Sequence, residues 1–430
     1  MIGKEIHQLA QELWPICRSI TGNGVRQSLK IIQKHIPDLK MYEVPSGTKC
    51  FDWTVPKEWN INDAYILDPQ GKKIIDFKKS NLHVVGYSIP VNKTLSLDEL
   101  KAHLYTLPEQ PDAIPYITSY YSPHWGFCLS QIQYEQLEEG NYQVVIDSEL
   151  KDGHLTYAEL LIPGESEQEV FLSSYVCHPS LANNELSGPT VTTFLAKWLL
   201  QQEKLKYSYR IILIPETIGS LTYLSRHLDE MKEKVIAGYN ITCIGDNRDY
   251  SYIPSRAENT LSDTVAQHVL HHTDKAYKTY PFYESGSDER RYCAPGVDLP
   301  VACIMRTKYN HYPEYHTSLD DLNLVTPEGL DGGYLALQRC LEVIEKNEVL
   351  KLTVICEPQL GKRGLYPNLS TKQSNAMVSN MMNFISYCDG TLSTLEIAQK
   401  IQVPMWELYE IIENLKEAKL LEVVDNNPHL

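Results

Sequence analysis

The spacing of hydrophobic and polar positions changes several times along the chain. Over residues 1–38, apolar positions recur at helical intervals in two runs, which predicts two amphipathic helices. Over residues 41–130, short apolar stretches alternate with turn residues, a pattern typical of a small β-rich module with one helix near 97–105. The stretches 142–146 and 155–161 then predict a pair of strands.

Further along, strand and helix patterns alternate. The predicted strands lie at 169–176, 209–214, 237–244 and 299–305, and the predicted helices at 190–202, 221–233, 261–272 and 330–346. This alternation favours a mostly parallel mixed sheet with helices on both faces, a three-layer α/β/α domain. We assign residues 1–40 and 131–350 to this domain, with 41–130 as an inserted module. Ligands of such sheets bind at the carboxyl ends of the strands.

The C-terminal part reads differently. Helical patterns at about 375–387, 393–401 and 404–419 precede a short strand, which predicts a winged-helix-like domain over 351–430. From Lys346 to the end the chain carries eight Lys or Arg residues against ten Asp or Glu residues. Because an acidic domain repels phosphate groups, we expect no nucleic-acid binding. A role in protein contact or self-association is favoured instead.

Composition narrows the class of protein. The chain has 430 residues, 43% of them hydrophobic, and a formal net charge of −16. No apolar run approaches the roughly 18 residues that a membrane-spanning helix needs, and the first residues are charged. Its ten cysteines include no C-x-x-C pair, which argues against a thiolate zinc finger. We therefore expect a cytoplasmic protein that does not bind a membrane.

Polar residues of catalytic type stand where the predicted strands end. His178 follows the strand 169–176, and Asn184 and Glu185 lie at the start of the next helix. Glu216 follows the strand 209–214, where partial burial would raise the pKa of its carboxyl toward the range of a general base. A lone histidine at a strand end is more often structural, and Glu216 could equally cap the helix that follows.

Two further positions extend this set. Asp246 ends the predicted strand 237–244, although Gly-Asp-Asn-Arg-Asp is also ordinary turn composition. His316 lies in a polar loop, where a neutral imidazole would suit zinc. Asp320 or a backbone carbonyl would then fix its tautomer. A surface histidine beside a helix start is the plain alternative.

Five features in this order resemble the zinc aminopeptidases of the bacterial leucyl aminopeptidase type. They are Leu-Ser-Gly at 186–188, Glu-Thr-Ile-Gly at 216–219, Asp246, Ser-Asp at 287–288 and Tyr-His-Thr-Ser-Leu-Asp at 315–320. A closer resemblance is to bacterial proteins that combine an aminopeptidase-like domain, a small inserted domain and a winged-helix tail, often linked to polysaccharide biosynthesis. That resemblance covers nearly the whole chain.

The resemblance implies roles for individual residues. His178, Asp246 and His316 would bind Zn²⁺, as one ion or two, and Glu216 would take a proton from metal-activated water. Asp288, Arg290 and Arg291 would line the substrate pocket. Two positions, however, depart from the family pattern.

The departures concern charge at the metal site. Asn184 stands where the family has a metal-bridging aspartate, and Thr217 replaces the second residue of a Glu-Glu pair. An amide oxygen is a neutral, weaker ligand, so Glu185 would substitute for the bridge, or the site would hold one metal. Glu216 could then be a ligand instead of the base.

The expected function is that of a zinc-dependent aminopeptidase-like hydrolase acting on a peptide or on a small substrate that carries an amide. The main alternative is a non-catalytic or weakly catalytic binding or scaffold protein on a peptidase fold, serving surface-polysaccharide biosynthesis. Asn184 and Thr217 favour the alternative, whereas the retained histidines and Glu216 favour the enzyme. A transcriptional regulator that uses the winged helix is a third hypothesis, which the acidic tail opposes.

Overall fold

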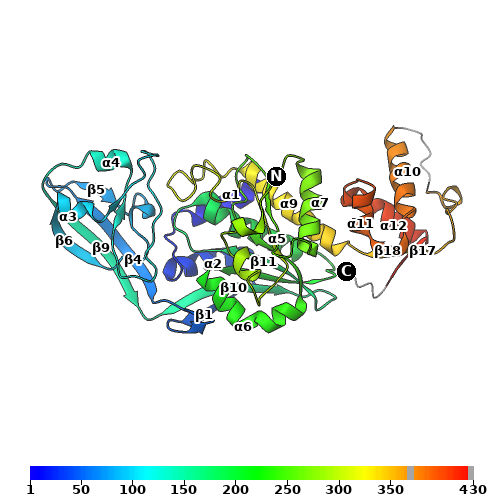
Figure 1. The fold of residues 1–430 in the computed structure, drawn as a ribbon, viewed down its shortest axis with the longest axis horizontal. Coiled ribbons are helices and arrows are strands. Elements are labelled where there is room, and N and C mark those ends of the chain that lie inside the picture. The colour runs from blue at the N-terminus through cyan, green and yellow to red at the C-terminus, as the bar shows by residue number, and fades with distance from the viewer. Residues whose placement is uncertain (366–371, 425–430) are drawn as a thin grey trace. The chain divides into compact units, whose positions relative to one another are not determined.

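The computed structural model describes residues 1–365 and 372–424. The chain divides into two compact units, residues 1–263 with 277–335 and residues 264–276 with 336–430. Figure 1 draws the ribbon of both units. We describe each unit by itself.

The first unit is organised by an eight-stranded sheet with the order β1-β10-β12-β11-β13-β16-β14-β15. In this order the strands are Lys40–Pro45, His154–Ile162, Ser208–Ile214, Glu169–Tyr175, Val235–Ile241, Val301–Met305, Ser251–Ile253 and Lys278–Thr279. The four strands β12, β11, β13 and β16 are mutually parallel, whereas β1 and β10 run antiparallel at one side. The expected mostly parallel mixed sheet is therefore confirmed.

Helices cover both faces of this sheet. The side chains of β11 alternate between the two faces, so each face of the strand contacts a different set of helices. Ser174 faces α5 (Ser187–Leu199), whose Gly188 lies against the carbonyl of Ile241 so closely that a Cβ atom would come within 2.4 Å of both Ser174 and Ile241. This close approach is why Leu-Ser-Gly requires its glycine. The helices α1 (Gly3–Leu13) and α2 (Asn23–His35) pack against α5.

The opposite face of β11 meets a second group of elements. Phe171 and Tyr175 share a buried cluster with Tyr223 and Leu224 of α6 (Ile218–Lys234) and with Tyr292 of α8 (Glu289–Tyr292). All seven residues of β11 are buried, as expected for a strand covered on both sides. The predicted three-layer α/β/α architecture is confirmed.

A separate four-stranded antiparallel sheet has the order β5-β4-β9-β6. Its strands are Lys73–Asp76, Glu58–Leu67, Asn141–Lys151 and Val91–Ser96. The sheet thus takes strands from both sides of residue 130, where the inserted module is expected to end. The predicted pairing of 142–146 with 155–161 is wrong, because β9 pairs with β4 and β6 while β10 pairs with β1 and β12.

The second unit contains α10 (Lys372–Ile385), α11 (Thr394–Lys400) and α12 (Tyr409–Glu417) with a sheet of order β18-β17-β19. Its strands are Asp389–Ser393, Val349–Leu352 and Leu421–Val423. The predicted winged-helix-like domain is therefore present, although the last helix is interrupted by a 3₁₀ turn at Met405–Glu407. The predicted helix near 97–105 is shorter, since α3 is Leu97–Lys101.

Two helices, α7 (Leu261–Thr273) and α9 (Pro327–Glu345), contribute residues to both units. Across residues 1–365 and 372–424, no helix joins the length and the apolar character that a membrane crossing requires. All ten cysteines are free thiols, nine of them buried or partly buried.

Candidate active site

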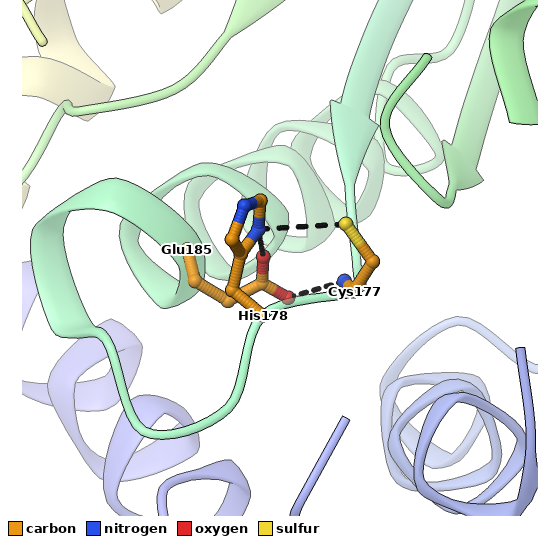
Figure 2. A group of neighbouring side chains, drawn as sticks. All are labelled: Cys177, His178 and Glu185. Atoms are coloured by element: carbon orange, nitrogen blue, oxygen red, sulfur yellow. Dashed lines mark hydrogen bonds and ion pairs between the residues drawn. The ribbon is translucent and has the colours of Figure 1, made fainter. Parts of the chain in front are cut away.

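His178 lies just beyond the carboxyl end of β11 and is almost fully buried, with 4% of its surface exposed. Its Nδ1 lies 2.9 Å from Oε2 of Glu185, as Figure 2 shows. The other carboxylate oxygen of Glu185 accepts a hydrogen bond of 2.7 Å from the backbone N–H of Cys177. Because an ionised carboxylate can only accept, the hydrogen-bond network places the imidazole proton on Nδ1. Nε2 then faces Glu216, whose Oε2 is 3.8 Å away.

Arg18 supports this arrangement from the N-terminal segment. Its Nε donates to the carbonyl of His178 at 2.9 Å and lies 3.3 Å from Oε1 of Glu185. Arg18 is buried, and burial lowers the pKa of its guanidinium while the charge of Glu185 opposes that effect. A buried ion pair of this kind fixes the carboxylate in place. Nothing in the local sequence around Arg18 indicates this contact.

Glu185 belongs to a π-helical turn, Ala182–Leu186, that leads into α5. Asp320 holds this turn, because its Oδ1 accepts from the backbone N–H of Asn183 at 2.6 Å and its Oδ2 from that of Asn184 at 2.9 Å. Burial raises the pKa of Asp320 to about 6. Among the described residues, the Asp320 carboxylate accepts from this turn and from the hydroxyl of Tyr312, and not from His316, the residue whose tautomer it was expected to fix.

Glu216 follows β12 and is oriented by an unusual backbone turn. Thr217 has φ +61° and ψ −75°, and the N–H of Ile218 donates to the carbonyl of Glu216 at 2.7 Å. These values describe a γ-turn of the rare, strained type. The hydroxyl of Ser287 donates to Oε1 of Glu216 at 2.7 Å. Burial raises the pKa of Glu216, and His178 lowers it.

His316 comes to the same place from the loop after β16. Its ring centroid lies 5.8 Å from that of His178, and its backbone has φ +56°. The ring stacks on Tyr315 at 3.9 Å. Burial, assisted by the charge of His178, lowers the pKa of His316 to about 3, so the imidazole is neutral at neutral pH.

A strap from the inserted module, residues 114–118, covers the two histidines. The ring of Tyr116 lies 5.2 Å from that of His178 and 5.1 Å from that of His316. The strap is joined to the His316 loop by the bonds Tyr116 N–H to His316 O and Ser318 N–H to Ile114 O, both 2.9 Å long. The sequence carries no local signal for this contact, because the partners are 200 residues apart.

Asp246 is buried at the end of the segment that follows β13, with 1% of its surface exposed. Four hydrogen bonds use both of its oxygens, from the backbone N–H and hydroxyl of Thr307 at 2.9 and 2.7 Å, from Asn183 Nδ2 at 3.0 Å and from Arg248 N–H at 2.9 Å. Within residues 1–365 and 372–424, the group of three or more close metal-type donors is Cys177, His178 and Glu185. Asp246, Glu216 and His316 therefore all lie outside that group.

Asn184 is also buried, and its amide is only half satisfied. Its Nδ2 donates to the hydroxyl of Tyr175 at 2.9 Å, whereas its Oδ1 has no hydrogen-bond partner. A buried carbonyl oxygen without a partner is costly unless a ligand or an ion takes the place of water.

The residues expected at the substrate pocket separate into two kinds. Asp288 is fully buried, and its Oδ1 accepts from Thr217 N–H at 2.9 Å and from the hydroxyl of Ser220 at 2.7 Å, so it braces the γ-turn beneath Glu216. Burial, with a contribution from Glu216, raises the pKa of Asp288 to about 7. Arg290 and Arg291 instead line an open hollow of about 610 Å³.

The donor set suits one zinc ion. Nε2 of His178 lies 3.8 Å from the carboxylate of Glu216, and the rings of His178 and His316 both lie next to Tyr116. Imidazole with carboxylate is a common zinc environment. A ligating histidine usually donates its other N–H to a carboxylate, which is what His178 does toward Glu185. A paired site would further need Asp246, whose oxygens are engaged elsewhere.

Comparison with known proteins defines the class. The fold is shared with a zinc aminopeptidase from Bacillus subtilis, whose structure is 11% identical, has a TM-score of 0.58 and covers 80% of this chain and 94% of that chain. An aminopeptidase from Aneurinibacillus sp. strain AM-1 aligns with a TM-score of 0.51 at 13% identity, over 80% of this chain and 93% of that chain. The first unit thus has an aminopeptidase fold, and the expected resemblance is confirmed.

The chain belongs to the family described as a domain of unknown function, DUF4910, which matches residues 7–347. A winged helix-turn-helix family matches residues 348–423. A Clostridium acetobutylicum protein, provisionally named a polysaccharide biosynthesis protein with an aminopeptidase-like domain, is 46% identical over 98% of this chain and 97% of that one. A crystal structure from the same organism, provisionally described as a peptidase, has 45% identity, a TM-score of 0.92 and coverage of 98% and 96%.

Proposed function

We propose that the protein is a zinc-dependent aminopeptidase-like hydrolase that cleaves a peptide or amide bond. The observation that carries the proposal is the proximity of Glu216 and of His316 to His178 at the carboxyl edge of the sheet, on a fold shared with zinc aminopeptidases. Zn²⁺, when bound, supplies a Lewis acid that acidifies water and polarises a carbonyl group. We assign one ion to His178 and His316, with the unpartnered Oδ1 of Asn184 as a further neutral donor.

Glu216 is the proposed general base. Burial raises the pKa of its carboxyl, which brings the group closer to the pH at which it exchanges protons efficiently. The hydroxyl of Ser287 fixes one oxygen, so the other remains free on the side of His178. The γ-turn at Thr217, braced by Asp288, keeps this carboxylate directed toward His178.

Two of the expected metal ligands have different roles in this proposal. Glu185 holds the tautomer of His178 through Nδ1, and Asp246 orders the loops around Asn183 and Thr307. Neither role requires direct contact with the metal.

The substrate that we propose is a short peptide or a small molecule with an amide. The Tyr116 strap limits the space above the histidines, which favours compact substrates. The provisional name of the Clostridium acetobutylicum relative supports a substrate from surface-polysaccharide biosynthesis. The free cysteines of the present chain suit a reducing compartment, so we place the protein in the cytoplasm.

A second candidate function is binding or scaffolding without catalysis. The engagement of both Asp246 oxygens and the neutral side chain of Asn184 favour it, because each lowers the negative charge available to a metal. For the winged-helix unit we propose protein contact or self-association, since its last helix carries mostly acidic charge.

Elemental analysis and kinetics test the proposal together. We expect about one zinc per chain in the purified protein and hydrolysis of aminoacyl amides that falls at least about 100-fold in Glu216→Gln, the scale of general-base catalysis. Glu203→Gln, an exposed change of the same type, is the matched control and should keep the wild-type rate. Zinc-free protein that still folds, or equal rates for wild type and Glu216→Gln, would favour the scaffold.

A further inference from the structure

The hollow beside α6 and α8 is lined by apolar residues and two arginines. Its walls include Phe51, Leu221, Leu228 and Val297, together with Arg290 and Arg291, and its volume is about 610 Å³. No acidic residue is among the described residues that line it. In a chain with 55 acidic residues against 39 basic ones, this local excess of positive charge needs an explanation.

Both guanidinium groups are oriented by backbone contacts and keep donors free. Arg290 Nη1 donates to the carbonyl of Ser285 at 3.0 Å, and Arg291 Nη1 donates to that of Ser287 at 2.8 Å. Among the described residues, neither side chain forms an ion pair with a carboxylate. An arginine with its remaining N–H groups free is well suited to a carboxylate or phosphate, which it can bind in a bidentate manner.

Hydrogen bonds through Ser287 link the hollow to the proposed reaction centre. Arg291 contacts the carbonyl of Ser287, and the hydroxyl of Ser287 donates to Glu216 at 2.7 Å. Leu221, which also lines the hollow, lies one turn after the γ-turn of Thr217. A ligand bound by Arg291 is therefore linked to Glu216 through one residue, Ser287.

Phe51 also lines the hollow. It forms the tip of the hairpin β2–β3 (Lys49–Cys50 and Trp53–Thr54), which packs against α6. Its side chain remains 53% exposed and its backbone has φ +53°, a left-handed conformation that is uncommon for a bulky residue. An exposed aromatic ring in the same hollow as two arginines offers an apolar surface in addition to a positive one.

We propose that this hollow is a subsite for an anionic group on the substrate, a carboxylate or a phosphate, carried on the part that does not react. The Arg290 and Arg291 guanidinium groups bind the anion, and Phe51 with the leucines of α6 contacts the adjoining apolar portion. The inference deepens the proposed function, on which it rests only for placing the scissile bond at Glu216. It predicts that acidic amides are preferred over neutral ones.

Binding measurements separate this inference from catalysis. Calorimetry on Glu216→Gln protein, which should not turn over, compares glycyl-glutamate amide, glycyl-phosphoserine amide and the neutral isostere glycyl-glutamine amide. We expect at least one anionic probe to bind about tenfold more tightly than the neutral one, with the difference shrinking as salt is raised. The stronger of the two anionic probes identifies the anion as carboxylate or phosphate.

Variants locate the effect. Arg290→Gln/Arg291→Gln in the Glu216→Gln background should reduce the preference for the anionic probe to less than about threefold. Arg226→Gln, an exposed arginine on α6 outside the hollow, should leave it unchanged. Equal affinities for charged and neutral probes, absence of binding by both anionic probes, or a preference that survives the double substitution would each overturn the subsite. If the preference for the anionic probe is present but the wild type does not hydrolyse amides, only the proposed reaction is contradicted and the subsite stands.

Discussion

The imidazole Nδ1 of His178 meets the carboxylate of Glu185 at 2.9 Å, and this contact determines which nitrogen faces the cleft. Arg18 lies on the far side of the same carboxylate at 3.3 Å, so a chain of three buried groups ends at the nitrogen proposed to bind metal. The position of a site residue is thus set by a segment 160 residues earlier.

Arg18→Met should cost about 3–5 kcal/mol of unfolding free energy, because it leaves the carboxylate of Glu185 buried without its partner. The double variant Arg18→Met/Glu185→Gln removes that charge and should recover most of the loss. It should nevertheless bind zinc about 10–100-fold more weakly, since His178 loses its ionised acceptor. Denaturant unfolding and zinc titration against a chelator measure the two effects. A double variant with wild-type zinc affinity would contradict the role given to Glu185.

Tyr116 should control the size of the substrate. Tyr116→Ala removes the ring above His178 and His316, so the rate on longer or bulkier amides should rise relative to that on the smallest amides. Tyr116→Phe retains the ring, loses only the contact of its hydroxyl with that of Tyr120, and should keep the wild-type ratio. The ratio of kcat/KM for a tripeptide amide to that for an amino-acid amide is the measurement. An unchanged ratio in Tyr116→Ala shows that the strap does not limit the substrate.

The fold was largely predictable from the sequence because buried parallel strands and amphipathic helices leave strong periodic signals. The sheet that β9 joins was not predictable. The alternation of apolar and polar residues shows that a strand has two different faces, but it does not show which sheet the strand joins. The strand-end rule found His178 and Glu216, and the structure places them 3.8 Å apart. Arg18 and Tyr116 were missed because their contacts join distant segments, which no local pattern encodes.

Asp246 illustrates a different limit. Its position after a strand was identified correctly, yet the hydrogen bonds that occupy its oxygens come from Thr307, Asn183 and Arg248 and depend on the tertiary structure. Sequence position alone cannot separate a carboxylate that binds a ligand from one that orders loops. The role of Asp246 in metal binding therefore remains a prediction.

Asp288 should make stability depend on pH in a defined direction. Its pKa in the folded state is about 7, above its ordinary value of 3.8, so its contribution to stability is present below pH 3.8 and is lost as pH rises to about 7. Asp288→Asn removes this dependence. The unfolding free energy of this variant should therefore rise relative to that of the wild type, by on the order of 1–3 kcal/mol, as the pH increases from 4 to 7. Thermal unfolding across that range is the measurement, and a difference between the two proteins that is constant with pH would refute the assignment.

His268 should give the winged-helix unit a sensitivity to acid. Its buried Nε2 accepts a hydrogen bond of 2.9 Å from the backbone N–H of Met405, and burial lowers its pKa to about 4. Because the folded-state value lies below the ordinary 6.5, stability is full above pH 6.5 and falls as pH decreases toward 4. His268→Gln should flatten this decline, as reported by the fluorescence of Trp406, whose ring lies 6.0 Å from that of His268. A decline of the same steepness in the variant would exclude His268 as its cause.

The backbone hydrogen bonds between the strap and the His316 loop couple the candidate site to the inserted module. Local opening of the small sheet would withdraw Tyr116 and at the same time release the carbonyl of His316, while the large sheet kept its own core. Damage to the β4–β9 ribbon can thus disturb the candidate site in molecules whose large sheet stays folded.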